Sequence, residues 1–267
     1  MTARALLVAG FPNSGTTITA MILGQHPAAF ATGELTEFPD KRQFADYNVC
    51  SCGQAMAACS FWCGVRDAYL DGPRDDARLV EIIAAHAGRP LVVDVAHRID
   101  RAEQLIANPK LDLRVIHMVR TRVAVLNSRL RRLYGRKLIG AYRPSRVTKV
   151  FKLGRRHEAY LRQMAGIMER LGERGLEVDY DQLCLDPETW LGRIGDFLAL
   201  DFSDTAARLV AGEALPRVPH LMRGNGRLRT AEAIVVRRDA AFQSELTAVD
   251  SLLYRAGAGV VRAGLAP

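Results

Sequence analysis

Short apolar runs alternate along the chain with longer segments in which apolar residues recur at helical spacing. Four runs predict strands, and the first of them is apolar on both faces, which is typical of a strand buried inside a parallel sheet. These runs are Ala5–Gly10, Leu91–Val95, Leu113–Val119 and Leu176–Tyr180. Because helical segments separate them, the pattern predicts an α/β fold with a mostly parallel sheet.

The intervening segments predict helices at Thr16–Leu23, Asp76–Ala87, Ala124–Leu133, Arg156–Leu171 and from Pro187 to near Leu198. Proline is favoured in the first turn of a helix, so Pro187 marks a helix start. No internal repeat or low-complexity linker interrupts the pattern. We therefore expect a single domain over residues 1–267, with helices covering both faces of the sheet.

The overall charge narrows the class of ligand. The chain has 267 residues and a formal net charge of +8, which favours an anionic partner such as a nucleotide or an acidic glycan. No uninterrupted apolar stretch reaches the roughly 18 residues of a membrane-spanning helix, so no span is expected. The first apolar run breaks at Gly-Phe-Pro-Asn, unlike a secretory signal, and we expect a cytoplasmic protein.

The segment GFPNSGTT, Gly10 to Thr17, has the glycine spacing of a phosphate-binding loop but carries Thr16 where such loops have lysine. Glycines let backbone N–H groups approach a phosphate, and the N-terminus of the following helix adds partial positive charge. The position between a buried strand and a helix predicts phosphate binding. The missing lysine disfavours a kinase or NTPase, which needs it near the β- and γ-phosphates.

This loop resembles the 5′-phosphosulfate loop, P-[KR]-S-G-T-T, of the PAPS-dependent sulfotransferases. The residues in its place are Pro12, Asn13, Ser14, Gly15, Thr16 and Thr17. Gln25-His26-Pro27 and Gly33-Glu34-Leu35 follow as in bacterial and tyrosylprotein-type members, and the resemblance runs from about residue 6 to residue 229. It implies a P-loop sulfotransferase-like fold, nearer the tyrosylprotein and carbohydrate type than the cytosolic aryl type. It also implies PAPS (3′-phosphoadenosine 5′-phosphosulfate) as co-substrate. Asn13 departs from the family's usual lysine or arginine.

Arg120 and Ser128 form the second part of the predicted donor site. Arg120 directly follows the third predicted strand, and Ser128 lies on the next helix, eight residues on. A guanidinium grips phosphate oxygens bidentately, and a hydroxyl adds a directional hydrogen bond. In the sulfotransferases this pair binds the 3′-phosphate of the donor. The family's R-D-P-R-A-V form is replaced here by RTRVAV, with the spacing kept.

Two further segments are candidate donor contacts. By resemblance Tyr180 lies beside the adenine of the donor, although a tyrosine that only packs at a strand end is an equal alternative. Gly224, Asn225 and Arg227 belong to a glycine-rich segment like the H-x-x-x-G-N of bacterial members. Its backbone N–H groups would wrap the 3′-phosphate, unless the segment is simply a turn.

Sulfuryl transfer needs a base for the acceptor proton, and no metal is chemically required. Glu34 occupies the region where tyrosylprotein-type members keep acidic residues, and Glu37 is a spare. His97 follows the second predicted strand, where relatives commonly have lysine, and its pKa range suits proton transfer. We predict that Glu34 and His97 both contribute, and which of them is the base is left open.

Cys50, Cys52, Cys59 and Cys63 cluster in a predicted insert at about residues 48–66. Their C-x-C and C-x-x-x-C spacings match a structural zinc site poorly. Free buried thiols are therefore favoured over a disulfide, and a disulfide over zinc.

Residues 129–156 contain eleven Lys or Arg and no Asp or Glu. Such a run is either an irregular, mobile connection or, as we favour, a basic flap over an anionic acceptor or the donor. Nucleic acid is not expected as a partner, because the stretch offers only Tyr134, Tyr142 and Phe151 for stacking and no recognised module.

The sequence thus predicts a sulfotransferase that moves a sulfuryl group from PAPS to a hydroxyl in one in-line step. The acceptor is left open among small molecule, glycan, lipid and tyrosine, as is the oligomeric state. The alternative is an atypical P-loop kinase or NTPase with Asp94 as magnesium ligand. A third hypothesis, a non-enzymatic protein that binds nucleotides or nucleic acid, rests only on the positive net charge.

Overall fold

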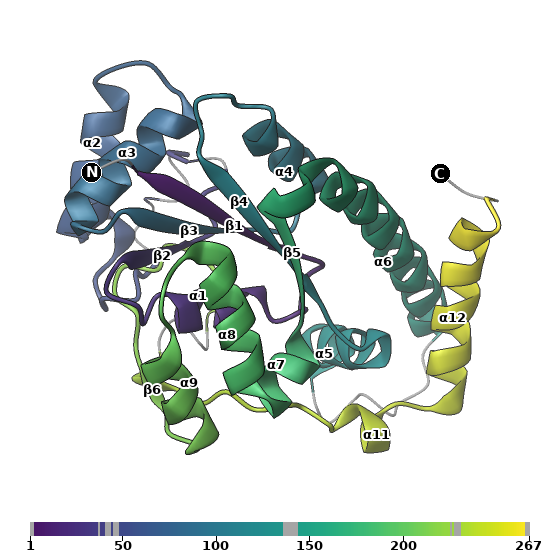
Figure 1. Cartoon of the computed structure of the whole chain (residues 1–267). Helices are drawn as coiled ribbons and strands as arrows, with labels where there is room; N and C mark the ends of the chain where they lie inside the picture. The colour runs from purple at the N-terminus through teal and green to yellow at the C-terminus, as the bar shows by residue number, and fades with distance from the viewer. Residues whose placement is uncertain are drawn as a thin grey trace.

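The structure, a computed structural model, describes residues 3–36, 38–40, 44, 48–135, 144–224, 226 and 231–264. Five parallel strands form one sheet in the order β2-β3-β1-β4-β5 (Figure 1). They are β1 (Arg4–Gly10), β2 (Ala29–Gly33), β3 (Leu91–Ala96), β4 (Leu113–Val119) and β5 (Gly175–Asp179). The predicted α/β class, a single domain with a parallel sheet flanked by helices, is confirmed.

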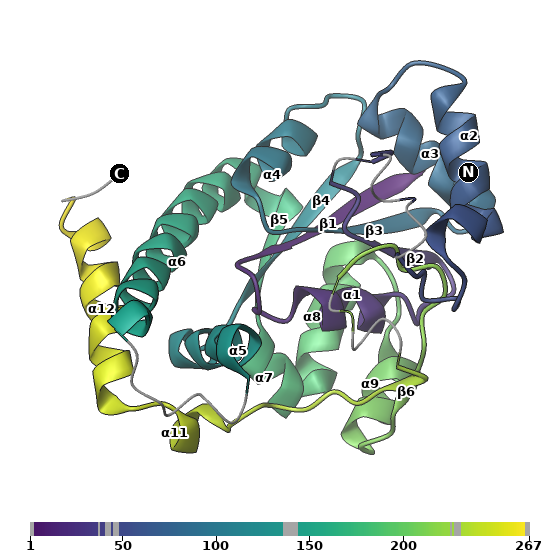
Figure 2. The same cartoon turned by 180° about the vertical axis from the view of Figure 1, so that it is seen from behind.

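Helices cover both faces of the sheet, as seen from the two sides in Figures 1 and 2. One face carries α2 (Ser60–Leu70), α3 (Asp76–Ala87), α4 (Ile99–Ile106) and α6 (Pro144–Leu171). The other carries α1 (Thr16–Leu23), α7 (Tyr180–Leu185), α8 (Pro187–Leu198) and α9 (Ser203–Val210). The remaining elements are α5 (Arg122–Tyr134), α11 (Phe242–Glu245), α12 (Ala248–Arg262) and the antiparallel pair β6 (Leu215–Pro216) and β7 (Ala233–Ile234). No helix within the described ranges is both long enough and apolar enough to cross a membrane.

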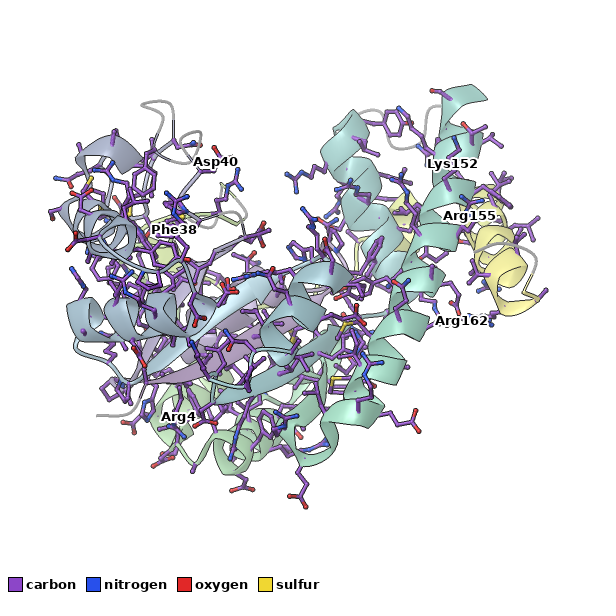
Figure 3. All side chains as sticks on the ribbon, turned by 90° about the horizontal axis from the view of Figure 1, so that it is seen from above. Arg4, Phe38, Asp40, Lys152, Arg155 and Arg162 are labelled. Atoms are coloured by element: carbon purple, nitrogen blue, oxygen red, sulfur yellow. The ribbon has the colours of Figure 1, made fainter. Side chains whose placement is uncertain are left out.

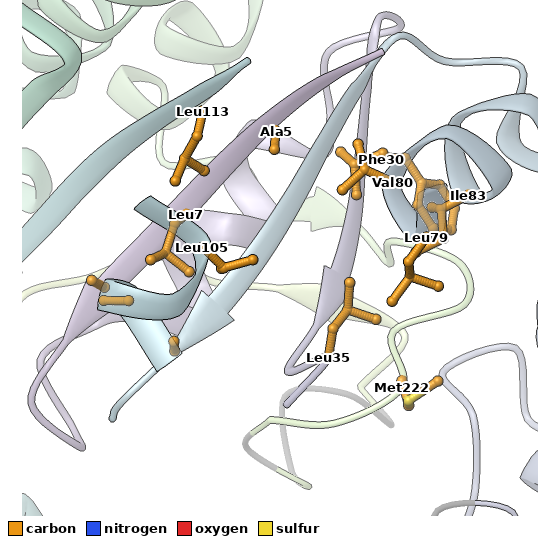
Figure 4. Close-up of a cluster of buried hydrophobic side chains, with 14 of the residues drawn as sticks. Ala5, Leu7, Phe30, Leu35, Leu79, Val80, Ile83, Leu105, Leu113 and Met222 are labelled. Carbon is orange, nitrogen blue, oxygen red and sulfur yellow. The ribbon is translucent and has the colours of Figure 1, made fainter. Parts of the chain in front are cut away.

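The alternation of side chains along β1 divides the core into two layers. Leu7 packs toward α3 and α4, in the cluster that Figure 4 shows with Leu105 and Leu113. Leu6 and Val8 point to the other face and pack with α1 and α8. All three β1 side chains are fully buried, which contributes roughly 1.5–3 kcal/mol for each large apolar side chain. Burial on both faces is the physical reason why this strand is apolar from Ala5 to Gly10.

The structure contains a strand that the hydrophobic pattern did not predict. β2 has the sequence AFATG, in which small residues and a terminal glycine weaken the usual β signal. It pairs with β3 at one edge of the sheet and is nevertheless buried throughout. Packing against neighbouring elements, and not strand propensity, therefore stabilises β2.

Over its described part the basic stretch is almost entirely helical and not irregular. Residues 129–134 belong to α5 and residues 144–156 to α6, which begins twelve residues earlier than expected; residues 136–143 lie outside the described residues. Arg131 donates to Glu245 at 2.5 and 2.6 Å, and buried Arg146 makes a bidentate pair with buried Asp250. These acids come from the C-terminal region, so part of the charge run is compensated across the fold.

Helix α12 runs along α6 at the side of the molecule (Figures 1 and 2). The approach is close at two glycines. A Cβ atom on Gly154 would lie 2.0 Å from the Tyr254 carbonyl oxygen, and one on Gly257 would lie 2.1 Å from that of Phe151. Lys152, Arg155 and Arg162 of α6 lie on the side of the molecule next to α12, away from Phe38 and Asp40 (Figure 3).

The Cys-rich insert lies between β2 and α3 and includes a 3-10 turn (Met56–Ala58) and α2. All five cysteines of the chain are described, and all are free thiols. The alternative of a disulfide is therefore not what the structure shows.

Candidate active site

All five strands of the sheet contribute to one cavity at their carboxyl ends. The residues directly after β2, β3, β4 and β5 are Glu34, His97, Arg120 and Tyr180, and all four line it together with the loop after β1. The cavity has a volume of about 530 Å³. Parallel strands end at the same edge of a sheet, where α/β proteins bind their ligands. The topology therefore brings together residues that lie far apart in sequence.

The loop after β1 makes a tight turn that leads directly into α1. Asn13 and Gly15 have positive φ angles of 76° and 94°. A Cβ atom on Gly15 would lie 2.2 Å from the ring of Tyr180, so only glycine fits between the loop and this side chain. Tyr180 is 4% exposed, which fits the packing alternative, although it also lines the cavity.

The donors of the loop suit an anionic ligand. Helix α1 starts at the loop without a side-chain cap, and the first N–H groups of any helix lack intrahelical partners. Asn13 Nδ2 and Ser14 Oγ are buried and have no hydrogen-bond partner among the described residues. Buried donors are normally paired, so these atoms and the helix terminus fit a bound phosphate or phosphosulfate group.

Arg120 is held against the loop by a network that includes a residue the sequence analysis missed. Its Nη1 donates to the Asn13 carbonyl oxygen at 3.1 Å, and its guanidinium lies 5.2 Å from the centre of the Tyr180 ring. Asp181 Oδ1 is 3.8 Å from Arg120 Nε, and its other oxygen accepts from the Thr121 N–H at 2.9 Å. Asp181 is therefore a positioning residue for Arg120. The signal for it was an acidic residue directly after Tyr180, at the start of a helix.

Helix α5 brings Ser128, Arg129 and Arg132 to the same cavity. The pKa of Arg129 is lowered, first by burial and then by the nearby charges of Arg132 and Arg156. Crowded cations at a cavity wall are stabilised by an anion. Sequence analysis singled out Ser128 but assigned the two arginines only to a general basic stretch.

Glu34 and His97 face each other across the cavity edge, with His97 Nε2 3.5 Å from Glu34 Oε1. His97 Nδ1 is 2.7 Å from the Gly10 carbonyl oxygen, which can only accept, so Nδ1 carries a proton. Burial lowers the pKa of His97, but its bonds to Glu34 and Gly10 outweigh this and raise it above the ordinary value. Burial raises the pKa of Glu34, but His97, Arg223 and Arg132 bring it below the ordinary value. The pair is therefore stabilised as carboxylate and imidazolium.

The glycine-rich segment reaches the cavity at Gly224, where an added Cβ atom would lie 3.0 Å from Thr17 Cγ2. Asn225 and Arg227, predicted as donor contacts, and Glu37, the spare acid, lie outside the described residues. Thr17 and Gly224 thus form facing walls of the cavity.

Asp94, the magnesium ligand of the kinase alternative, does not line this cavity. Its Oδ1 accepts the N–H groups of Leu35 at 2.9 Å and Val95 at 2.8 Å. Burial raises its pKa to about 6, against the lowering effect of Arg101. Asp94 therefore connects the end of β2 to β3 and lies away from the cavity in which the kinase alternative would need its magnesium ligand.

The sequence pattern that defines the sulfotransferase family matches residues 103–204. The sulfotransferase domain of an olefin synthase from Synechococcus PCC 7002 is similar in structure, with a TM-score of 0.55 and 19% identity, covering 98% of this chain and 95% of that chain. The sulfotransferase domain of the curacin biosynthetic pathway has a TM-score of 0.54 and 16% identity, covering 96% and 97%. No curated protein matches the chain in sequence.

A mouse sulfotransferase complexed with PAP has a TM-score of 0.51 and 12% identity, covering 94% of this chain and 82% of that chain. At these identities the structural likeness concerns the fold. Together with the family pattern, it confirms the resemblance to sulfotransferases that the loop and the Arg120–Ser128 spacing indicated.

Proposed function

We propose that this chain, similar to the sulfotransferases in sequence and fold, is an enzyme that moves a sulfuryl group from PAPS to a hydroxyl-bearing acceptor. The observation that carries the proposal is the convergence on one cavity of the phosphate-type loop, the Arg120 and Ser128 side chains, and the Glu34–His97 pair. The first two groups suit a phosphate-bearing donor, and the third suits proton transfer from an acceptor.

The donor would bind along the loop side of the cavity. The N–H groups at the start of α1, with Ser14 Oγ and Asn13 Nδ2, would hold the phosphosulfate. Arg120 and Ser128 would hold the 3′-phosphate, as the resemblance implies. The mouse relative complexed with PAP, the desulfated form of this donor, supports the same ligand class here.

In the transfer step the acceptor oxygen forms a bond to sulfur while the bond from sulfur to the bridging oxygen of the donor breaks. The bridging oxygen keeps the electron pair and leaves with 3′-phosphoadenosine 5′-phosphate, and the acceptor proton passes to a base. Glu34 fills this role, because its carboxylate is ionised and lines the cavity. His97 holds Glu34 through Nε2 and is itself oriented by Gly10.

Negative charge develops on the bridging oxygen, where this chain has Asn13 in place of the usual cation. Arg129 and Arg132 line the same cavity and supply positive charge there. Positive charges held in place before the reaction stabilise such a transition state without further reorganisation. These two arginines are therefore our candidates to replace the missing lysine of the loop.

The test is thermal unfolding with added nucleotide. Adenosine 3′,5′-bisphosphate should raise the Tm of the protein without magnesium. A ligand that binds only the folded state stabilises that state. Arg120→Ala and Ser128→Ala should weaken the shift, while Glu34→Gln should keep it. Stabilisation by ATP with magnesium alone would reject the sulfotransferase in favour of a kinase. A screen of acceptors with labelled PAPS then identifies the acceptor class.

A further inference from the structure

Three cysteines of the insert meet a histidine from the other end of the chain. The side chains of Cys50, Cys52, Cys59 and His220 each offer one ligand atom, and these four atoms all lie within 4.8 Å of one another. Cys50 and Cys59 are fully buried, and Cys52 and His220 are partly buried. We propose that these four residues form a structural zinc site that fixes the C-terminal segment around residue 220 to the Cys-rich insert.

The spacing of the ligand atoms is that of a tetrahedral zinc site. With Zn–S bonds of about 2.3 Å and a Zn–N bond of about 2.0–2.1 Å, two sulfur ligands lie about 3.8 Å apart and sulfur and nitrogen about 3.5 Å apart. Cys59 Sγ is 3.7 Å from Cys50 Sγ and 3.8 Å from Cys52 Sγ. His220 Nδ1 is 3.4 Å from Cys59 Sγ and 3.8 Å from Cys50 Sγ. Three thiolates and one imidazole are also a donor set that zinc prefers.

The backbone around the four side chains is arranged to present them. Cys50 and Cys52 lie on a tight turn, in which the Gly53 N–H donates to the Cys50 carbonyl at 2.9 Å and Gly53 has a φ of 92°. Only a residue that tolerates the left-handed region closes this turn at low cost. Cys59 directly precedes α2, so the turn and the start of this helix together present three of the four ligand atoms.

His220 is oriented by residues other than the thiols. Its ring stacks on Phe61 with centroids 4.8 Å apart, and its carbonyl oxygen accepts from Trp62 Nε1 at 2.7 Å. Its φ of 60° is unusual for a residue other than glycine, which indicates that the surrounding contacts hold it there. Neighbours that fix the orientation of a ligating imidazole are a regular feature of metal sites.

A disulfide explains the cluster less well. Bonded sulfurs are about 2.05 Å apart, well short of any sulfur pair here, and a Cys50–Cys59 bond would leave Cys52 and His220 without a role. The sequence analysis ranked zinc last because C-x-C spacing is uncommon in zinc sites. The fourth ligand, His220, lies 161 residues beyond Cys59, so no local spacing rule could include it.

The site lies beside the segment that leads to the donor cavity. Ser51, between two of the cysteines, accepts the Leu221 N–H and donates to the Val218 carbonyl oxygen. The Met222 N–H then donates to the Thr32 carbonyl oxygen at 2.8 Å, two residues before Gly224 reaches the cavity. Zinc would thus hold the cavity wall at Gly224 in place. This last consequence rests on the proposed function, whereas the zinc site itself does not.

The experiment is elemental analysis of the full chain, purified without chelators from zinc-supplemented cells. We expect one zinc per chain in the wild type, and loss of it in Cys59→Ser and His220→Ala. Cys63→Ser is the matched control, because Cys63 lies in the same insert but donates to the Ala57 carbonyl oxygen and is not one of the four. That variant should retain zinc.

X-ray absorption on the wild type keeps the test valid if the ligand variants fail to fold. We expect a shell of three sulfurs at about 2.3 Å and one nitrogen at about 2.0–2.1 Å. Wild-type protein without zinc, a Cys50–Cys59 disulfide found by mass spectrometry, or zinc retained by Cys59→Ser would overturn the proposal. Failure of adenosine bisphosphate to bind while zinc is present would instead reject the proposed function and leave the zinc site standing.

Discussion

At the scale of single residues, the direction of one hydrogen bond decides what His97 can do. Its Nδ1 proton is committed to the Gly10 carbonyl oxygen, so only Nε2 exchanges protons, and Nε2 faces Glu34. A neutral imidazole would point a lone pair at a carboxylate. The imidazolium form avoids this, in agreement with the raised pKa of His97 and the lowered pKa of Glu34.

Replacing His97 should shift the pH dependence of kcat/KM. In the wild type the acid limb of kcat/KM should lie below the ordinary glutamate pKa of about 4.3, because Glu34 must be ionised to accept a proton. Burial of Glu34 raises its pKa, and in the wild type the cation on His97 opposes this effect. His97→Gln removes that cation, so the pKa of Glu34 should rise and the acid limb of kcat/KM should move to higher pH. Kinetics with saturating donor and varied acceptor across the acid range measure kcat/KM for the acceptor and its acid limb.

Glu34→Gln itself should lower kcat by about 10²–10⁴, the range for loss of a general base. The matched control is Glu177→Gln, which changes a second Glu–His pair, with His117 at 3.2 Å, that does not line the cavity. Its kcat and its pH profile should stay close to those of the wild type. A wild-type acid limb near or above pH 6.5 would contradict Glu34 as the base and point to His97.

At the scale of secondary-structure elements, two glycines allow α6 and α12 to approach closely. The Cβ positions of Gly154 and Gly257 are filled by carbonyl oxygens of the facing helix. The buried Arg146–Asp250 pair joins the same two helices near their N-termini. The contact therefore combines tight packing with an ion pair whose partners would be costly to leave unpaired.

Gly257→Ala should destabilise the protein by roughly 1–3 kcal/mol, the usual cost of overpacking, because the new methyl group collides with the Phe151 carbonyl oxygen. Gly259→Ala is the control in the same helix, since its added Cβ would meet no atom of the described residues within 4 Å. In Gly259→Ala the higher helix propensity of alanine should stabilise the folded protein by about 0.5–1 kcal/mol. Urea unfolding measures both changes, and equal effects would show that the helices can separate without cost.

At the scale of the whole molecule, the net charge of +8 is distributed unevenly. Part of the basic stretch is neutralised by C-terminal acids, as at Arg131 and Arg146, while Arg129 and Arg132 remain at the cavity. The field around the cavity should therefore attract anions. Positive charge near a cleft raises the association rate of an anionic ligand, and salt reduces the effect.

The KM for PAPS should rise several-fold between about 0.1 M and about 1 M salt, as the screening length falls from about 10 Å to about 3 Å. Arg132→Gln should flatten this dependence, because Arg132 is an exposed charge at the cavity. Arg255→Gln, an exposed arginine on α12 that does not line the cavity, is the control and should keep the wild-type slope. Identical slopes in all three proteins would exclude a role for Arg132 in attracting the donor.

The sequence by itself determined the elements whose signals are local. The bounds of α1, α3 and α8 agree with the predicted ranges, because helical spacing, Gly15 before α1 and Pro187 at the start of α8 are read from neighbouring residues. The phosphate-type loop was recognisable for the same reason. Since parallel strands end at one edge, the residues that follow the predicted strands also indicated where a site would form.

Only the tertiary structure decided which distant residues meet. The pairing of Arg146 with Asp250 leaves no pattern along the chain. An acidic residue after Tyr180 is visible in the sequence, but only the fold shows that Asp181 lies beside Arg120. The cysteine cluster is the sharpest case: its local spacing argued against zinc, and His220 supplies the missing ligand from a segment 161 residues away. Spacing rules report what the backbone places close together within a few residues, whereas a ligand set is completed by the packing of elements against one another.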